Sequence, residues 1–378
     1  MRFASLARRV VDAGNCRSYS GHGGQLRTAL FFPGHGVQRV GMTAQWLEAF
    51  PGTAKPFLEE TDEILGCSLS RIIAEGPNSK LDASTNAQPA IMATSVMIMR
   101  ILESEFSFKT KQEIDVTLGH SLGEYAALIS SGHLEYKDAL KMVRGRAAIM
   151  EECSMKAKEE TGDRYGMVAL VCVPERLENL VTSIHEFLGY GSDGVKDDSS
   201  HVPAIEQVQI ANINSSNQIV LSGSLPRIRQ LLIQIKEFGG HDPRAVEIKS
   251  DSPFHNPIMM PAKDYMRRAL AKTNIRFPGD MPCVSNVSGR PFGSKHDLIE
   301  KLSGQAVNTV RWWDSIKYLH QEAGVRRWLG VGPGKVGRNL VGKEVGRVQS
   351  KTGGVWAITD PKEVETTLQD FLDKAAAG

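Results

Sequence analysis

The sequence predicts an α/β fold that consists of a parallel sheet with a smaller module inserted into it. Three observations lead to this class. An apolar run at 116–118 breaks at a glycine and restarts as a helix with regularly spaced apolar residues. Residues 165–251 then alternate strands and helices in βαββαβ order, which is the ferredoxin-like arrangement. The first pattern returns after Ser252, so this module interrupts a core that we assign to 25–164 and 252–378.

The core is expected to begin with an apolar strand, Leu26–Phe32, that ends in a glycine-rich loop at 34–38. A helical region follows, and 81–99 contains a second helix that we expect to be entered through Gln88 and Pro89. Open α/β sheets bind ligands at the carboxyl ends of their strands. The loop at 34–38 is therefore expected to border a ligand site.

Ser121 occupies the turn between the next strand and its helix, with Gly119 and Gly123 on either side. This Gly-x-Ser-x-Gly pattern is typical of a nucleophile elbow, a sharp turn that exposes the serine hydroxyl. Glycines are needed because the two backbones approach too closely for side chains. The backbone N–H group of Leu122 and those of the first loop, 34–38, are expected to form an oxyanion hole.

Arg146 indicates which kind of acyl group Ser121 would receive. If 136–152 is a helix, its apolar residues share one face, and Arg146 falls within that face, whereas Arg144 and Lys141 fall outside it. A guanidinium directed at the interior needs an anion. A buried ion pair with Asp or Glu, or a side chain that reaches the surface, would also fit. The functional alternative is a bidentate clamp for a substrate carboxylate beside the serine.

The inserted module has six expected elements. They are strands at 167–173, 208–214, 218–223 and 244–248, and helices at 174–188 and 225–238. The Gly189–Pro203 segment is rich in Gly, Asp and Ser, and we expect it to be a surface loop.

A base for the serine is sought among ten histidines. His120 is adjacent to Ser121, so its side chain is expected to point away and to pack beside the elbow. His255 lies in the irregular, Pro-bracketed segment 252–257, which joins the module back to the core. Pockets form at such junctions. A histidine there can be an ordinary core or surface residue, or a base whose second nitrogen is held by a carboxylate or a backbone carbonyl.

Two further strands are expected near 282–286 and 327–331. The second is followed by a glycine-rich loop, Gly332 to Lys335, at the same sheet edge as the elbow. Its spacing is not that of a nucleotide phosphate loop, so a tight turn near the site is the expectation.

The composition excludes several classes of protein. Of 378 residues 41% are hydrophobic, and no apolar stretch approaches the roughly 18 residues that span a membrane. The net charge is +2 with dispersed charges, which does not indicate nucleic-acid binding. The five cysteines are scattered, and we expect them to be reduced.

The N-terminus has a different composition. Residues 1–24 contain four arginines and several serines but one acid, Asp12. An Arg-rich, acid-poor segment with an amphipathic pattern is typical of a mitochondrial transit peptide. A disordered tail is the alternative. The interpretation predicts the mitochondrial matrix as the location, with cleavage near Arg17 to Ser20.

Together these motifs resemble the malonyl-CoA:acyl-carrier-protein transacylase family, over nearly the whole chain from Leu26. The motifs that carry the resemblance are Phe32-Pro-Gly-His-Gly-Val-Gln38, Gln88-Pro-Ala90, Gly119-His-Ser-Leu-Gly-Glu-Tyr-Ala127, Arg146, Asn212-Ile-Asn214, Pro253-Phe-His255 and Val331-Gly-Pro-Gly-Lys335. One departure lies in the first loop, where the family usually has Gln and this chain has His35. The resemblance implies that the oxyanion donor in this loop is a backbone N–H group, which His35 can supply.

The resemblance implies an α/β-hydrolase-like core with a ferredoxin-like subdomain, Ser121 as nucleophile and His255 as base. It implies that Arg146 binds the malonyl carboxylate, and that Gln88 and Asn214 lie near the acyl pocket. Phe254 resembles the malonyl-specific rather than the methylmalonyl-specific members.

The implied reaction is a ping-pong transfer of malonyl from CoA to the phosphopantetheine thiol of acyl carrier protein, through a malonyl-serine, for fatty acid synthesis. No metal and no cofactor of its own is implied. With the transit-like leader, the resemblance is to the mitochondrial branch of type II fatty acid synthesis, and we expect a monomer. Six basic residues are candidates to receive an acidic carrier, or are solvated surface charges: Arg39, Lys263, Arg267, Arg268, Lys335 and Arg338.

Two other functions remain open. A serine esterase of the α/β-hydrolase type needs the chain order Ser, acid, His, and several acids lie between Ser121 and His255. The interior Arg146 and the inserted module argue against it. A non-catalytic subunit that docks a carrier protein is the second alternative.

Overall fold

The computed structural model describes residues 27–189, 202–250, 252–346 and 353–376. The expected transit peptide, 1–24, and most of the expected loop at Gly189–Pro203 lie outside the described residues.

The main sheet is parallel throughout, with the strand order β7-β2-β1-β8-β9. Its strands are β1 (Arg27–Phe32), β2 (Val116–Gly119), β7 (Cys283–Val284), β8 (Val325–Val331) and β9 (Gly354–Ile358). β1 is central, and its last residue pairs with Gly119 of β2, while Phe31 pairs with Gly330 of β8. The loops that follow β1, β2 and β8 therefore meet at one edge of the sheet.

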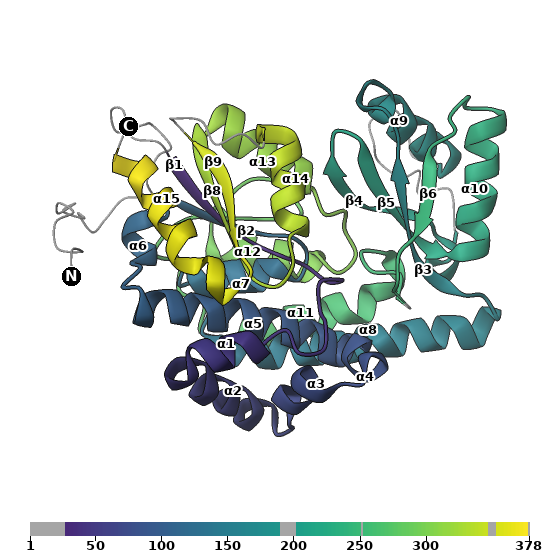
Figure 1. Cartoon of the computed structure of the whole chain (residues 1–378). Helices are drawn as coiled ribbons and strands as arrows, with labels where there is room; N and C mark the ends of the chain where they lie inside the picture. The colour runs from purple at the N-terminus through teal and green to yellow at the C-terminus, as the bar shows by residue number, and fades with distance from the viewer. Residues whose placement is uncertain (1–26, 190–201, 251, 347–352, 377–378) are drawn as a thin grey trace.

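The second sheet is antiparallel and has the order β4-β5-β3-β6. Its strands are β3 (Tyr165–Val171), β4 (Gln209–Ser215), β5 (Gln218–Ser224) and β6 (Arg244–Glu247), with helices α9 (Leu177–Phe187) and α10 (Leu225–Glu237). This βαββαβ unit forms the smaller lobe on the right of Figure 1. The predicted fold class, an α/β core with an inserted ferredoxin-like unit, is confirmed.

Helices cover both faces of the main sheet. In chain order they are α1 (Ala44–Ala49), α2 (Pro51–Leu65), α3 (Leu69–Glu75), α4 (Asn78–Asp82), α5 (Ser84–Glu105), α6 (Thr110–Glu113), α7 (Gly123–Ser130), α8 (Tyr136–Thr161), α11 (Met260–Lys272), α12 (Lys295–Gly304), α13 (Trp312–Lys317), α14 (Val336–Val345) and α15 (Val364–Ala376). None of the helices within the described residues is both long and apolar enough to cross a lipid bilayer.

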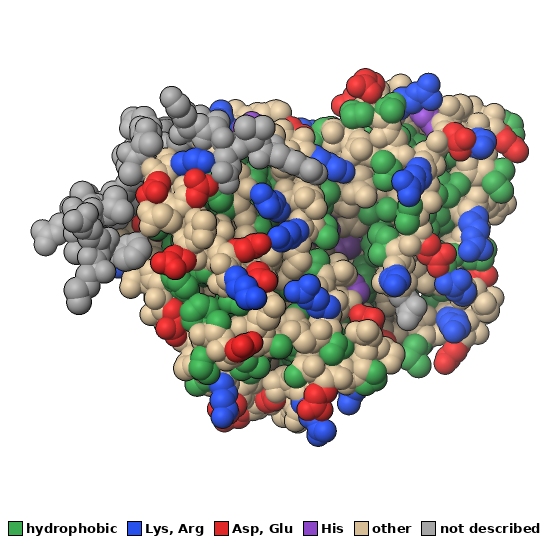
Figure 2. Space-filling model, viewed as in Figure 1, with side chains coloured by type: hydrophobic (Ala, Val, Ile, Leu, Met, Phe, Trp, Pro, Cys, Tyr) green, Lys and Arg blue, Asp and Glu red, His purple; other side chains and the backbone are tan. Residues whose placement is uncertain are grey.

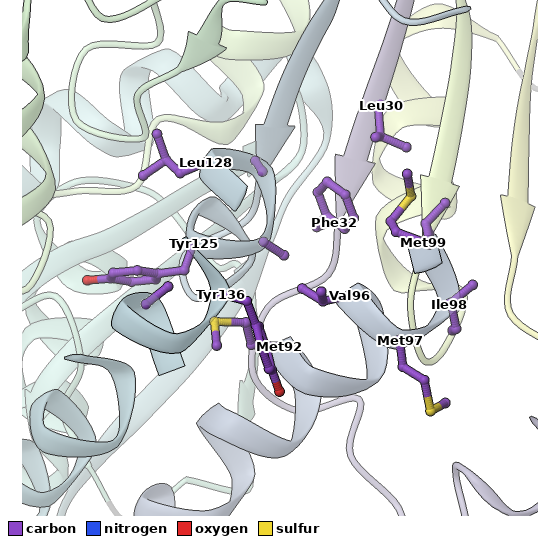
Figure 3. Close-up of a cluster of buried hydrophobic side chains, with 14 of the residues drawn as sticks. Leu30, Phe32, Met92, Val96, Met97, Ile98, Met99, Tyr125, Leu128 and Tyr136 are labelled. Atoms are coloured by element: carbon purple, nitrogen blue, oxygen red, sulfur yellow. The ribbon is translucent and has the colours of Figure 1, made fainter. Parts of the chain in front are cut away.

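The alternation of β1 divides the core into two layers. Leu30 and Phe32 face one side and pack against α5, as Figure 3 shows for their neighbours Val96 and Met99. The intervening Phe31 faces the other side, where the apolar residues of α13 and α14 lie. Successive side chains of a strand point to opposite faces, so β1 contributes to both layers and is buried from Thr28 to Phe32.

The long helix α8 connects the two lobes, since it begins under the main sheet and ends at β3 of the smaller lobe (Figure 1). Its first half packs in the main core through Leu140 and Val143. Its second half packs through Met150 and Cys153 against a separate cluster that also contains Phe254. One helix thus carries Arg146 between two apolar clusters, at the junction of the lobes.

One local expectation was wrong. Gln88 and Pro89 do not begin a helix but lie inside α5, which starts at Ser84. Proline has no N–H for the carbonyl four residues earlier, here that of Thr85. The side chain of Arg144 donates to the Thr85 carbonyl instead, which satisfies it. Strand β9 was not predicted, and β7 is shorter than expected.

Candidate active site

Ser121 sits in the turn that joins β2 to α7, and its backbone has a φ of +50°. A side chain at Gly123 would place its Cβ 2.5 Å from the Phe32 carbonyl oxygen, and one at Gly119 would collide with the backbone of Gly123. Both glycines are therefore required by the close approach of strand and helix. The expected elbow geometry is present, with the serine side chain held out of the turn.

His255 is the histidine that meets the serine. Its Nε2 lies 2.7 Å from Ser121 Oγ, and its Nδ1 lies 2.7 Å from the backbone carbonyl oxygen of Gln305. A carbonyl accepts only, so Nδ1 carries the proton and Nε2 is free to accept the proton of Ser121. This is the arrangement that a general base requires.

Burial, together with the positive charge of Arg146, lowers the pKa of His255 to about 3. The imidazole is therefore neutral at neutral pH. The backbone of His255 has a φ of +56°, a strained value for a residue with a side chain. It lies between Pro253 and Pro257, in the segment that returns the chain from the smaller lobe.

The partner of His255 bears on the esterase alternative. An α/β-hydrolase esterase orients its base with a carboxylate. Here the Gln305 carbonyl occupies the Nδ1 position. The structure thus selects the carbonyl from the two acceptors that the sequence left open.

Arg146 points into the interior, as predicted, and is 2% exposed. Its Nη1 donates to Gln88 Oε1 at 2.6 Å, and its Nη2 donates to Gln305 Oε1 at 3.0 Å. Both acceptors are neutral amides. The structure therefore shows neither of the two alternatives for Arg146, a direct ion pair with Asp or Glu or a side chain that reaches the surface.

The guanidinium still has unused capacity. Its Nε is buried without a hydrogen-bond partner within the described residues. Burial lowers the pKa of Arg146, while the nearby Tyr125 and Glu124 raise it. A buried cation held only by amide oxygens is stabilised further by an incoming anion. This geometry favours an anion such as a carboxylate as the ligand, and the role of Arg146 in binding it stays a prediction.

Gln305 was not predicted, and no local motif marks it. It lies just after α12, and it connects the base with Arg146, through its main-chain and side-chain oxygens respectively. Its Nε2 also donates to the carbonyl oxygen of Ser121 at 2.9 Å. Only the three-dimensional fold brings it to the serine, 184 residues away in the chain.

Asn286 was also missed, and it holds the elbow from the side of β7. Its Oδ1 accepts from the backbone N–H of Ser121 at 2.6 Å, and its Nδ2 donates to the Gly119 carbonyl at 2.7 Å. The Ser121 N–H is therefore not available to an oxyanion, which agrees with the expectation that Leu122 supplies the donor.

The expected oxyanion donors lie on touching loops. Leu122 directly precedes α7, and a Cβ at Gly34 would lie 2.5 Å from the His120 carbonyl oxygen. The backbone N–H groups of Leu122 and His35 have no hydrogen-bond partner within the described part of the chain. Their role as an oxyanion hole stays a prediction.

The side chain of His35 lies edge-on to Phe254, with ring centroids 5.5 Å apart. Its Nε2 is buried without a partner among the described residues, and burial lowers its pKa to about 4. The two residues thus line the same side of the site, between the first loop and the base.

Asn214, which the resemblance places near the acyl pocket, contacts His120. Its Oδ1 lies 2.8 Å from His120 Nε2, and the His120 ring packs edge-on against Trp312. His120 therefore turns away from Ser121, as expected. Asn214 fixes the residue beside the nucleophile, and its contact with substrate stays a prediction.

Figure 2 shows a hollow between the two lobes, with histidine side chains at its floor and basic side chains on its left rim. Of the six basic candidates, five are exposed and Lys263 is half-buried; the exposed ones are Arg39, Arg267, Arg268, Lys335 and Arg338. Lys335 pairs with Glu363 at 3.4 Å, and Arg267 pairs with Glu300 at 3.1 Å.

Comparison with known proteins points in one direction. Residues 30–185 match the acyl transferase domain family. The chain is 34% identical to the malonyl CoA-acyl carrier protein transacylase of Bacillus subtilis over 349 residues, which cover 92% of this chain and 98% of that protein.

Solved structures agree. The structure of a malonyl CoA-acyl carrier protein transacylase from Clostridium perfringens is 28% identical, with a TM-score of 0.75, and the match covers 93% of this chain and 98% of that one. A malonyl-transacylase in complex with its type II PKS acyl-carrier protein also matches, with 27% identity, a TM-score of 0.75 and coverage of 91% of this chain and 99% of that one.

Proposed function

Because the chain belongs to the malonyl-CoA:acyl-carrier-protein transacylase family, we propose that it transfers malonyl from CoA to the phosphopantetheine thiol of an acyl carrier protein. It is an acyltransferase, and the carrier brings its own phosphopantetheine. One observation carries the choice of acyl group: the buried Arg146 lies beside the Ser121–His255 pair, and no carboxylate of the described residues pairs with it directly.

In the first half-reaction, His255 Nε2 takes the proton of Ser121 Oγ as the oxygen attacks the thioester carbonyl. The N–H groups of Leu122 and His35 stabilise the oxyanion. The C–S bond then breaks, and the proton on Nε2 passes to the departing CoA sulfur. Malonate remains as an ester on Ser121.

In the second half-reaction, the carrier thiol gives its proton to His255 and attacks the ester. The C–O bond to Ser121 breaks, and the serine recovers its proton from Nε2. Throughout, Arg146 binds the free carboxylate of the malonyl group, while its Nη1 also donates a hydrogen bond to Gln88. A neutral acyl group would leave the guanidinium unpaired, which disfavours it.

Incubation with labelled malonyl-CoA separates the three candidate functions. A stable adduct that passes to holo-carrier protein and is lost in Ser121→Ala supports transfer. Rapid release of free malonate into water supports the esterase. A protein that binds carrier but acquires no label supports the docking subunit.

We propose that the carrier docks at the rim of the hollow, near the loops after β1 and β8. Arg39 and Arg338 are exposed there, and the two loops touch, since a Cβ at Gly334 would lie 3.1 Å from Val37. Charge reversal at Arg338 should raise the KM for carrier while leaving the malonylation of Ser121 by malonyl-CoA unchanged. Equal effects on both half-reactions would contradict this placement.

We also propose that the protein acts in the mitochondrial matrix, which the arginine-rich, acid-poor composition of 1–24 supports. Fusion of these residues to a fluorescent protein should direct it to mitochondria, and a cytosolic signal would contradict the proposal.

We further propose a monomer, because Ser121, His255 and Arg146 meet within one chain. Light scattering of the purified protein tests this.

A further inference from the structure

Glu124 is a buried carboxyl beside the site that the proposed reaction does not use. It lies in the first turn of α7, three residues after the nucleophile, and is 0% exposed. Its Oε1 accepts from the backbone N–H of Asn286 at 3.0 Å, and its Oε2 accepts from the side-chain nitrogen of Gln305. Both partners in turn contact the elbow. Burying a carboxyl group is costly, so hydrogen bonds that link it to the elbow through two residues suggest that Glu124 has a function in the site.

The contacts of Gln305 define that role. Its amide oxygen accepts from Arg146 Nη2, while its amide nitrogen donates to the Ser121 carbonyl and to Glu124. A guanidinium only donates hydrogen bonds, and a carboxylate only accepts them. The amide can therefore satisfy both neighbours in one of its two orientations only, and Glu124 favours that orientation.

We propose that Glu124 is a positioning residue for acid-bearing acyl groups, because it holds the Gln305 amide in the orientation that accepts from Arg146 and leaves the guanidinium open to a substrate carboxylate. The inference rests on the proposed function. Glu124 and Arg146 attract one another across the amide without forming a direct ion pair. A direct pair would occupy the edge of the guanidinium that the substrate needs, whereas the intervening amide leaves that edge available.

The base is affected less than Arg146. His255 is held by the main-chain carbonyl of Gln305, which does not move when the side-chain amide turns. Loss of Glu124 should therefore impair recognition of the carboxylate more than the chemistry at Ser121. A residue that only stabilised the fold would impair both alike.

The pH dependence offers an independent readout. Burial raises the pKa of Glu124 to about 8, against the hydrogen bonds from Asn286 and Gln305 and the charge of Arg146. The other titratable groups that interact with it are Tyr125 on its own helix and Cys283 on β7. The carboxyl gains its charge as the pH rises through this region, so the preference for malonyl over acetyl should rise with it. Since the pKa of His255 is lowered to about 3, the base does not titrate there.

The test is Glu124→Gln, assayed with malonyl-CoA and acetyl-CoA as donors. A glutamine offers one acceptor oxygen to two donors, so it no longer fixes the Gln305 amide. At pH 9, where the Glu124 carboxyl is mostly charged, we expect kcat/KM for malonyl-CoA to fall roughly ten- to a hundredfold, mainly through KM, and that for acetyl-CoA to change less than about threefold. The rise of preference between pH 7 and pH 9 should disappear. An equal fall for both donors, or an unchanged preference, would overturn the proposal.

Two further comparisons sharpen the experiment. The matched control is Glu151→Gln on α8, whose buried oxygen has no hydrogen-bond partner within the described residues and which should retain the preference. Gln305→Leu removes the amide but keeps the carbonyl for His255, and it should lower the preference as Glu124→Gln does. The double variant should be no worse than either single one, because the two residues act in series. Effects that multiply would show that Glu124 acts by another route.

If Glu124→Gln does not fold, Glu124→Asp keeps the charge on a side chain one methylene shorter. It should retain part of the preference and of its pH dependence, and loss of both would overturn the proposal. The wild-type protein separates this outcome from failure of the proposed function. If the wild type forms no malonyl-serine, both the proposed function and the role of Glu124 are contradicted. If the wild type forms malonyl-serine and the variants keep its preference, only the role of Glu124 is contradicted.

Discussion

The elbow around Ser121 and the clamp around Arg146 lie within one site but are built in opposite ways. The elbow is a run of consecutive residues, 119–123, and its shape is set by backbone conformation and by the close approach of Phe32. The clamp joins Arg146 to Gln88 and Gln305, which are 58 and 159 residues away, through side-chain hydrogen bonds. Backbone packing cannot adapt, whereas side chains can change partners. Substitutions in the elbow should therefore abolish activity, whereas substitutions in the clamp should reduce it only in part.

The largest expected effect is the loss of the nucleophile. Ser121→Ala leaves the turn intact and should lower the transfer rate by at least about 10⁴-fold, because no covalent intermediate can form. Initial rates with labelled malonyl-CoA measure this. A labelled adduct that persists in the variant would show that another residue carries the acyl group.

The clamp should respond more moderately. Arg146→Ala is expected to lower kcat/KM for malonyl-CoA by about a hundredfold, since two charge-assisted hydrogen bonds to the carboxylate are lost, and to leave acetyl-CoA nearly unaffected. Arg144→Ala is the matched control on the same helix. Arg144 donates to Asn86 and the Thr85 carbonyl, so its loss should cost stability but keep the preference.

The elbow backbone can be tested through stability. Gly123→Ala would place a Cβ 2.5 Å from the Phe32 carbonyl and 2.7 Å from the Pro33 carbonyl, both of which are backbone atoms. We expect the free energy of unfolding to fall by about 1–3 kcal/mol, with activity lost in the remaining folded protein. Gly52→Ala in α2 meets no atom within 4 Å and should be neutral or stabilising. Equal behaviour of the two variants would contradict the close-approach argument.

The same contrast explains which parts of the site the sequence could predict. A nucleophile elbow is written in five neighbouring residues, so Ser121 and its glycines were identified from spacing alone. Arg146 was identified from helical periodicity, because a cation on an apolar face is a local anomaly. Gln305 and Asn286 carry no such signal, since an amide near a helix end fits many roles. Only the packing of distant segments gives them partners.

The fold follows the same rule. The parallel core and the βαββαβ order were predicted from alternating periodicity, and both are confirmed. The start of α5 was wrong because a proline usually opens a helix. Here a distant side chain, Arg144, satisfies the carbonyl that Pro89 leaves without a donor. Strand β9 was missed at an edge of the sheet, far from any motif.

The smallest expected effect is the contribution of His133, which follows helix α7, to the pH dependence of the free energy of unfolding. Burial lowers the pKa of His133 to about 4, below the usual value near 6.5 for an unfolded chain. Between these values the unfolded state binds the additional proton, so stability falls as the pH falls. From pH 7 to pH 6 the loss from this group should be about 0.5–1 kcal/mol.

His133→Gln should remove that part of the pH slope in urea denaturation while leaving the preference for malonyl unchanged. An unaltered slope would mean that His133 has the same pKa in the folded and unfolded states. The result would also show whether the layer that supports α7 can be altered without disturbing the clamp.

The central claim is that Ser121 receives an acyl group that Arg146 has selected by its carboxylate. It is tested most directly by mass spectrometry of Ser121 after brief exposure to equimolar malonyl-CoA and acetyl-CoA. We predict a malonyl ester on Ser121 in the wild type, and a shift toward the acetyl ester in Arg146→Ala but not in Arg144→Ala. An unchanged excess of malonyl ester in Arg146→Ala, or an adduct on a residue other than Ser121, would contradict the account.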